Sequence, residues 1–261
     1  MIIEVNHLSF SYGIRPVLSD IHFCIEESTF LSVLGANGVG KSTLFRCLLA
    51  IIKNYQGEIN FDGREIRSMT QKKRASLIAY IPQIHRPHFG YSALDTVLMG
   101  TGHRFSIFSS PRRQHVDQAM RAMERLGISR LAGRNYSRLS GGEQQLVLIA
   151  RALAQEANVL IMDEPTSSLD FGNQIMVLNQ IKQLTSEGYM VIVSTHNPQH
   201  ALTFSDRVLA LKEGRILAYG NTDDCLTVDL IQDLYGITCQ MINTDLGRTF
   251  LPNIFTDEER R

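Results

Sequence analysis

A glycine-rich segment that ends in a lysine and two hydroxyl residues has the spacing G-x-x-x-x-G-K-[ST]. It follows an apolar run, Phe30–Leu34, and precedes a helix-compatible stretch, Leu44–Ile51. Glycines let successive backbone N–H groups point at an anion, and the start of the helix adds its positive dipole end. The pattern therefore predicts a loop that binds the phosphates of a nucleoside triphosphate. Its residues are Gly35, Ala36, Asn37, Gly38, Val39, Gly40, Lys41, Ser42 and Thr43.

Two acidic residues that follow a second apolar run can complete the chemistry. Lys41 can reach the β- and γ-phosphates, and we expect Asp163 to hold Mg²⁺ together with Ser42, directly or through water. Glu164, the next residue, would polarise the water that attacks the γ-phosphate. A strand that ends in a solvated acidic turn is the structural alternative. The phosphate loop in the same chain favours the catalytic interpretation.

A second candidate anion site opens another helix. Ser140, Gly141 and Gly142 precede a helical pattern that runs to about Ala154. A serine hydroxyl, two glycine amides and a helix N-terminus can together bind phosphate. Because we find one triphosphate loop in the chain, we expect this second site to serve the nucleotide of a neighbouring molecule. An ordinary serine cap is the structural alternative.

A sheet must position these residues. Continuous apolar runs at 158–162 and 190–194 are typical of strands buried on both faces of a parallel sheet. Gln83, Glu164 and His196 each follow an apolar run closely, as the phosphate loop does. Ligands of open α/β sheets bind outside the carboxyl ends of the strands, so we expect these residues to converge there.

Antiparallel strands and a helical insert are predicted around this core. Residues 2–10 and 21–25 alternate apolar and polar side chains, with a turn at 11–13. Residues 57–63 are typical of a short strand closed by an Asp-Gly turn. Helical segments dominate from 84 to 146, which predicts a helical subdomain inserted into the α/β core.

Composition and charge narrow the class of protein. Lys plus Arg and Asp plus Glu number 26 each, so no net field favours nucleic acid, and we expect no nucleic-acid partner. The four cysteines lack CxxC spacing, which indicates reduced thiols rather than a metal site or a disulfide framework. No run of about 18 apolar residues and no charged, apolar leader occurs. We therefore expect a soluble chain that is not exported and spans no membrane.

Taken together, these motifs resemble those of the ATP-binding cassette (ABC) ATPases over residues 2 to about 236. In that family, Gly35–Ser42 would be the Walker A motif, 159–163 the Walker B motif and Leu139–Glu143 the signature. The signature continues with Gln144-Gln145, where relatives often have an arginine. Other matching positions are Gln83 for the Q-loop, Ser167–Asp170 for the D-loop, His196 for the switch histidine and Tyr12 for the aromatic residue that stacks on adenine.

The resemblance implies an α/β P-loop NTPase with a parallel-sheet core, an N-terminal antiparallel β subdomain and an inserted helical subdomain that carries the signature. It also implies a head-to-tail dimer, in which two ATP molecules with Mg²⁺ lie between the Walker A motif of one copy and the signature of the other. Gln83 would sense Mg²⁺ and the attacking water, and His196 would bind the γ-phosphate and orient that water at Glu164. The residues implied at the second copy's nucleotide are Ser140, Gly141, Gly142 and Asp170.

A finer resemblance concerns the cargo. Residues 91–100 are similar to the region after the Q-loop in importers of metal chelates such as iron siderophores, haem, cobalamin or molybdate-like oxyanions. Residues 237–261, beyond the ATPase domain 1–236, are predicted to form a short hairpin tail, as that subfamily often has. The resemblance implies a peripheral subunit on the cytoplasmic face of the inner membrane, bound to a permease dimer and served indirectly by a substrate-binding protein. An exporter subunit or a soluble ABC ATPase is the alternative.

Overall fold

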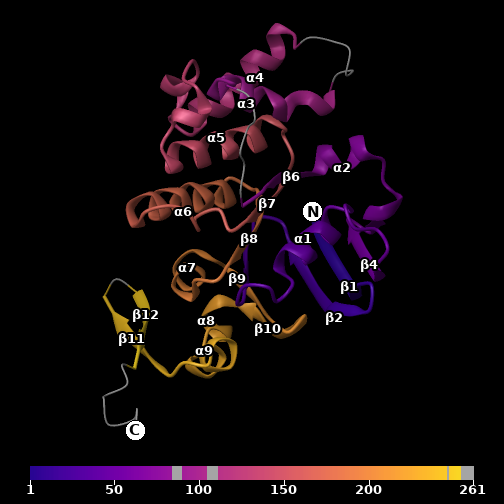
Figure 1. The fold of residues 1–261 in the computed structure, drawn as a ribbon, viewed down its shortest axis with the longest axis vertical. Helices are drawn as coiled ribbons and strands as arrows, with labels where there is room; N and C mark the ends of the chain where they lie inside the picture. The colour runs from indigo at the N-terminus through magenta and orange to yellow at the C-terminus, as the bar shows by residue number, and fades with distance from the viewer. Residues whose placement is uncertain (84–89, 105–110, 246, 254–261) are drawn as a thin grey trace.

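The computed structural model describes residues 1–83, 90–104, 111–245 and 247–253 (Figure 1). Its central sheet consists of β3 (Phe30–Leu34), β6 (Ile78–Ile81), β7 (Val159–Asp163), β8 (Met190–Thr195), β9 (Arg207–Lys212) and β10 (Arg215–Asn221). The spatial order of these strands is β10-β9-β3-β8-β7-β6. All neighbouring pairs are parallel except β9 and β10, which pair antiparallel. The predicted parallel core is therefore present, and it is extended by β9 and β10, which the sequence analysis did not identify.

An antiparallel sheet built from the N-terminal part of the chain lies beside this core (Figure 1). Its strands are β1 (Ile2–Tyr12), β2 (Arg15–Glu26), β4 (Gln56–Phe61) and β5 (Arg64–Glu65). The predicted Asp-Gly turn joins β4 to β5, with φ of 48° at Asp62 and 71° at Gly63, as a type I′ turn requires. The predicted turn at 11–13 is wrong at its start, because Ser11 and Tyr12 still pair with β2.

A helical layer lies on the other side of the sheet and contains α3 (Ala93–Leu98), η2 (Met99–Arg104), α4 (Arg113–Arg125), η3 (Ser129–Leu131), η4 (Tyr136–Arg138) and α5 (Gly141–Ala154). Capping boxes with a serine as the N-cap start α3, with Ser92 and Asp95, and α5, with Ser140 and Glu143. The predicted start of the insert at residue 84 lies outside the described residues. Its predicted end at residue 146 falls inside α5, which continues unbroken to Ala154.

The remaining helices are α1 (Lys41–Leu48), η1 (Ile66–Ser68), α2 (Gln71–Leu77), α6 (Phe171–Ser186), α7 (Pro198–Phe204), α8 (Thr222–Cys225) and α9 (Val228–Tyr235). Alternation along β7 explains how the layers hold together, since successive side chains of a strand point to opposite faces. Val159 and Ile161 pack in one core with α1 and the N-terminal sheet. Leu160 and Met162 pack in the other core with the helices α3 to α6. The helical insert thus shares its core with the sheet.

The chain continues past α9 into a hairpin of β11 (Cys239–Thr244) and β12 (Gly247–Pro252). Cys239 is buried in a third core, which contains residues of α7, α9 and β9, and Phe250 packs against that core. None of the described helices has both the length and the apolar character needed to cross a bilayer.

Candidate nucleotide-binding and hydrolysis site

The phosphate loop joins β3 to α1 and leaves the start of that helix open. Gly40 is the N-cap residue with a φ of 113°, and no side chain caps the helix. By contrast, Thr70 caps α2, Ser92 caps α3 and Ser140 caps α5. Backbone N–H groups in the first turn of a helix need an external partner, and α1 has no acidic residue in its first turn to compete for them. The donor set therefore suits a phosphate group.

Lys41 is held across the base of this loop. Its side chain is almost fully buried, and Nζ donates hydrogen bonds to the carbonyl oxygens of Gly35 at 2.7 Å and Ala36 at 3.0 Å. Nζ also lies 3.4 Å from Oε1 of Glu164. Burial lowers the pKa of Lys41, and the charge of Glu164 opposes that shift. Gly35 is needed because a Cβ at this position would lie 2.4 Å from the carbonyl oxygen of Leu211.

A cavity of about 290 Å³ opens above Lys41. Its lining residues are Val17, Asn37, Gly38, Gly40, Lys41, Ser42, Thr43, Gln83 and Glu164. Of the predicted loop residues, Val39 instead packs against the core between the two sheets, while Gly35 and Ala36 contribute carbonyl groups to Lys41. The cavity thus lies between the phosphate loop and the ends of β6 and β7, where the predicted strand-end residues were expected.

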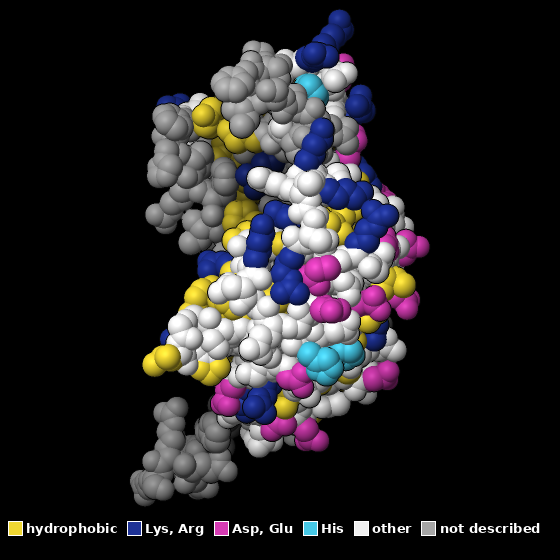
Figure 2. All heavy atoms as spheres, turned by 90° about the vertical axis from the view of Figure 1, so that its right-hand side faces the viewer, with side chains coloured by type: hydrophobic (Ala, Val, Ile, Leu, Met, Phe, Trp, Pro, Cys, Tyr) yellow, Lys and Arg dark blue, Asp and Glu magenta, His cyan; other side chains and the backbone are white. Residues whose placement is uncertain are grey.

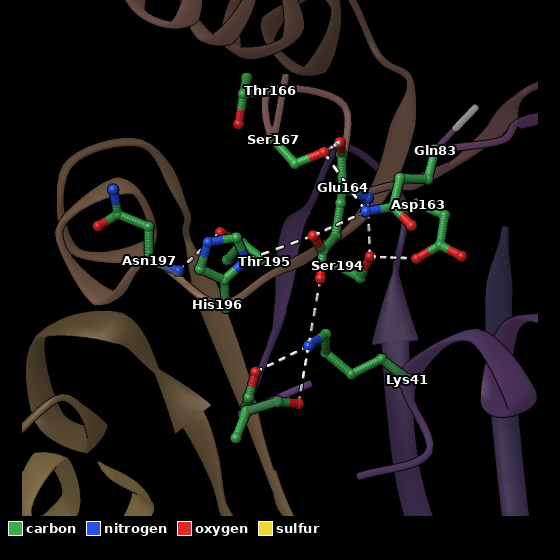
Figure 3. Close-up of polar contacts among 12 residues, drawn as sticks. Lys41, Gln83, Asp163, Glu164, Thr166, Ser167, Ser194, Thr195, His196 and Asn197 are labelled. Carbon is green, nitrogen blue, oxygen red and sulfur yellow. Dashed lines mark hydrogen bonds and ion pairs between the residues drawn. The ribbon is translucent and has the colours of Figure 1, made fainter. Parts of the chain in front are cut away.

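Glu164 is the centre of the polar contacts in Figure 3. Its carboxylate is 9% exposed and contacts three predicted site residues. Oε2 accepts a hydrogen bond from Nε2 of Gln83 at 3.2 Å and lies 3.3 Å from Nδ1 of His196, while Oε1 faces Lys41. Glu164 has a φ of 45°, an uncommon backbone conformation for a side-chain-bearing residue that the surrounding contacts must maintain. The structure therefore brings Lys41, Gln83, Glu164 and His196 together.

Asp163 and Ser194 lie behind Glu164, and Ser194 was not among the predicted site residues. The Ser194 hydroxyl donates to Oδ1 of Asp163 at 2.5 Å and accepts the backbone N–H of Glu164 at 2.8 Å. Asp163 and Ser194 face each other in the register of β7 and β8. Burial, followed by the nearby Asp163 charge, raises the pKa of Tyr80 to about 12. The available signal for Ser194 was a hydroxyl residue that follows the apolar residues Met190–Val193 within the same strand.

Replacing Ser194 by Ala is expected to lower kcat for ATP hydrolysis about 10-fold with little change in ATP affinity. The substitution leaves a buried carboxylate oxygen and the N–H of Glu164 without this partner, a loss of about 1–3 kcal/mol. ATPase kinetics and thermal unfolding would be measured beside Ser32→Ala, which removes a buried serine contact to Ser205 from β3. Equal kcat for the two variants would contradict a role of Ser194 at the site.

The second predicted anion site lies elsewhere in the chain. None of Ser140, Gly141, Gly142 or Asp170 lines the cavity described above. Ser140 caps α5, and a Cβ at Gly142 would lie 2.3 Å from Oδ1 of Asn173. Asp170 caps α6 by accepting the N–H of the same Asn173 at 2.9 Å, and this bond lowers the pKa of Asp170. The starts of α5 and α6 are thus packed together, away from the chain's own phosphate loop.

Tyr12 is also outside the cavity lining. It ends β1, is 47% exposed and makes an edge contact with Phe10. Its hydroxyl accepts a hydrogen bond from Arg46 of α1 at 3.3 Å. An exposed ring tied to α1 is compatible with stacking on a base, and that role remains a prediction.

Comparison with known proteins identifies the family. Residues 18–167 match the sequence profile described as ABC transporter. An uncharacterised ABC transporter ATP-binding protein of Haemophilus influenzae is 39% identical over 95% of this chain and 94% of its own length. The ferric enterobactin transport ATP-binding protein FepC of Escherichia coli is 31% identical over 94% of this chain and 90% of its own length. A solved structure assigned to the metal-chelate type of ABC transporter, in an inward-facing conformation, has a TM-score of 0.85 at 32% identity and covers 97% of both chains.

These similarities extend over nearly the whole chain, so they include the phosphate loop, the strand ends and the helical layer. They confirm the predicted P-loop fold with its parallel core, antiparallel N-terminal sheet and helices. The uncapped start of α1 has donors suited to a phosphate group, and Glu164 lines the same cavity. The chain belongs to the ABC transporter family and is one of its ATP-hydrolysing, ATP-binding subunits.

Proposed function

We propose that this subunit energises the import of a metal chelate, such as an iron siderophore, haem, cobalamin or a molybdate-like oxyanion. The observation that carries the proposal is the similarity over 97% of both chains to a transporter that has been assigned to the metal-chelate type. Three per cent of 261 residues is about eight, so most of the tail 237–261 belongs to the matched region. FepC, a relative named for ferric enterobactin transport, supports the same class of cargo.

The roles proposed for the site follow from its contacts. Lys41 would neutralise the phosphates, Glu164 would accept a proton from the attacking water, and His196 would orient that water and bind the γ-phosphate. Ser42 and Gln83 line the cavity and Asp163 lies behind it, so we propose that they hold Mg²⁺, with Asp163 acting through water. When bound, Mg²⁺ supplies charge neutralisation at the phosphate oxygens.

We further propose that two copies associate head to tail. Ser140, Gly141, Gly142 and Asp170 would then face the nucleotide bound to Lys41 of the other copy. Their position outside the cavity of their own chain supports this arrangement, because a serine hydroxyl and glycine amides at the start of α5 are suited to phosphate. Closure of the dimer on ATP and its release after hydrolysis would drive transport.

A cleft between α2, β6, η2 and α5 supports a permease contact. It has a volume of about 490 Å³, and among its lining residues Ile51 is 65% and Met99 is 47% exposed. We propose that a helix of a membrane subunit packs against these exposed apolar side chains. Basic side chains gather in the upper half of the face in Figure 2, the side that carries α2, and acidic ones in the lower half. This distribution supports a peripheral position on the cytoplasmic face of the membrane.

Isolation of the tagged chain from detergent-solubilised native membranes tests the proposal. We expect a polytopic permease to copurify, and Ile51→Glu should reduce its recovery strongly, since a carboxylate in an apolar contact is costly. Leu217→Glu on β10 is the matched control, because Leu217 is 42% exposed outside the cleft.

The recovered complex, reconstituted in liposomes, should accumulate one of the metal chelates named above in an ATP-dependent manner when its substrate-binding protein is added. ATP-dependent movement in the opposite direction would indicate the exporter alternative. Recovery of the chain only from the soluble fraction, alone or with ribosomes or DNA, would indicate the soluble ABC ATPase.

A further inference from the structure

The C-terminal part of the chain touches the segment that carries His196. Tyr235 is the last residue of α9, and its hydroxyl donates a hydrogen bond to the backbone carbonyl of His196 at 3.0 Å. Burial raises the pKa of Tyr235, and the negative charge of Glu164 contributes to the same shift. The phenol therefore keeps its proton at neutral pH and remains a donor.

The hairpin is attached to the same segment a few residues further on. Gln199, in the first turn of α7, donates from Nε2 to the carbonyl of Arg248 at 3.1 Å. Its Oε1 accepts the hydroxyl of Thr249 at 3.1 Å and the N–H of Phe250 at 3.2 Å. These bonds to β12 keep the C-terminal segment docked beside the His196 loop.

Sheet pairing ends at Thr195, the last residue of β8, which lies opposite Leu34 of β3, and local bonds hold the residues that follow. Oγ1 of Thr195 accepts the N–H of Asn197 at 3.0 Å, and Asn197 caps α7 through Oδ1. The imidazole of His196 is 50% exposed, so packing restrains it weakly. Its place 3.3 Å from Glu164 therefore depends on where the backbone at residue 196 is held.

We propose that Tyr235 is a positioning residue for hydrolysis, which holds the His196 backbone so that the imidazole stays at Glu164. The inference deepens the proposed function, because it rests on the role assigned there to His196. It makes α9 and the hairpin behind it part of the hydrolytic unit. A change in how the C-terminal segment packs would then alter turnover without any contact to the nucleotide.

Kinetic comparison of Tyr235→Phe with the unmodified subunit tests this inference. The substitution keeps the ring and removes one hydroxyl donor. We expect kcat for ATP hydrolysis to fall about 3- to 10-fold, the range of one neutral hydrogen bond, while KM for ATP stays within about twofold. We expect KM for ATP to stay nearly constant because no residue of α9 lines the phosphate cavity.

Tyr189→Phe is the matched control. The Tyr189 hydroxyl accepts a hydrogen bond from Arg125 at 3.0 Å between α4 and the loop after α6, outside the cavity lining. Each variant loses one hydrogen bond of a tyrosine hydroxyl, so both should show a change in thermal unfolding. Only Tyr235→Phe should also lower kcat, because only Tyr235 contacts the His196 backbone. Equal kcat in the two variants would overturn the inference.

A double-mutant cycle with His196→Ala separates positioning from general structural damage. With no imidazole left to position, Tyr235→Phe should reduce single-turnover hydrolysis no further in the His196→Ala background. Fully additive losses would overturn the inference. Normal turnover in His196→Ala alone would instead contradict the proposed role of His196. Reduced turnover in His196→Ala together with normal turnover in Tyr235→Phe would contradict only the role of Tyr235.

Discussion

Glu164→Gln is expected to reduce steady-state ATP hydrolysis by about 10²–10⁴-fold, the range that general-base catalysis contributes, and to leave ATP affinity nearly unchanged. The amide keeps the size of the side chain and cannot accept the proton of the attacking water. Gln83, Lys41 and His196 keep a polar neighbour at the same place. If hydrolysis releases the proposed closed dimer, the variant should accumulate as an ATP-bound dimer.

Phosphate-release kinetics, nucleotide titration and light scattering with Mg-ATP would measure turnover, affinity and dimerisation of Glu164→Gln. Glu187→Gln is the matched control, since Glu187 forms an ion pair with Arg125 on the surface, outside the cavity lining. Turnover of Glu164→Gln close to that of the control would disprove the catalytic assignment of Glu164.

Lys41→Ala is expected to weaken ATP binding itself. Loss of a charge-assisted contact to phosphate removes about 1.5–3 kcal/mol, which raises Kd roughly 10- to 150-fold. Turnover at a fixed ATP concentration should fall accordingly. The substitution also removes the donor to the carbonyl groups of Gly35 and Ala36, so the empty loop should lose some order.

Titration with a fluorescent ATP analogue would give the affinity of Lys41→Ala, and thermal unfolding would report on the fold. Lys182→Ala is a suitable control, because Lys182 pairs with Asp206 at 2.5 Å and is half-exposed, apart from the cavity lining. An unchanged Kd for Lys41→Ala would mean that the loop is not the phosphate site.

Features that depend on neighbours in sequence were predictable. The strand, loop and helix around Lys41 follow from an apolar run, glycines and a helix former in succession, and the structure has them in that order. The turn at Asp62-Gly63 and the start of α5 at Ser140 follow from positive φ and from capping, which are properties of a few adjacent residues. Buried strands such as β7 followed from unbroken apolar runs.

Features that depend on distant pairing were predicted less well. The turn after β1 starts two residues later than expected, because Ser11 and Tyr12 gain partners in β2. The insert was predicted to end at residue 146, which falls inside the helix that the sequence pattern itself extends to about Ala154; α5 ends there, and its apolar face packs into the core shared with the sheet. β9 and β10 were not identified, although β9 completes the parallel core beside β3.

By itself, the sequence determined the class of fold, the phosphate loop and the residues at the ends of the core strands. These rest on backbone preferences and on periodicity, which short segments carry with them. Only the tertiary structure decided that Ser194 bridges Asp163 and Glu164, and that Tyr235 reaches the carbonyl of His196. Such contacts depend on strand order, on the register of β7 against β8 and on where α9 docks. Packing of the whole chain sets those quantities, and no local pattern encodes them.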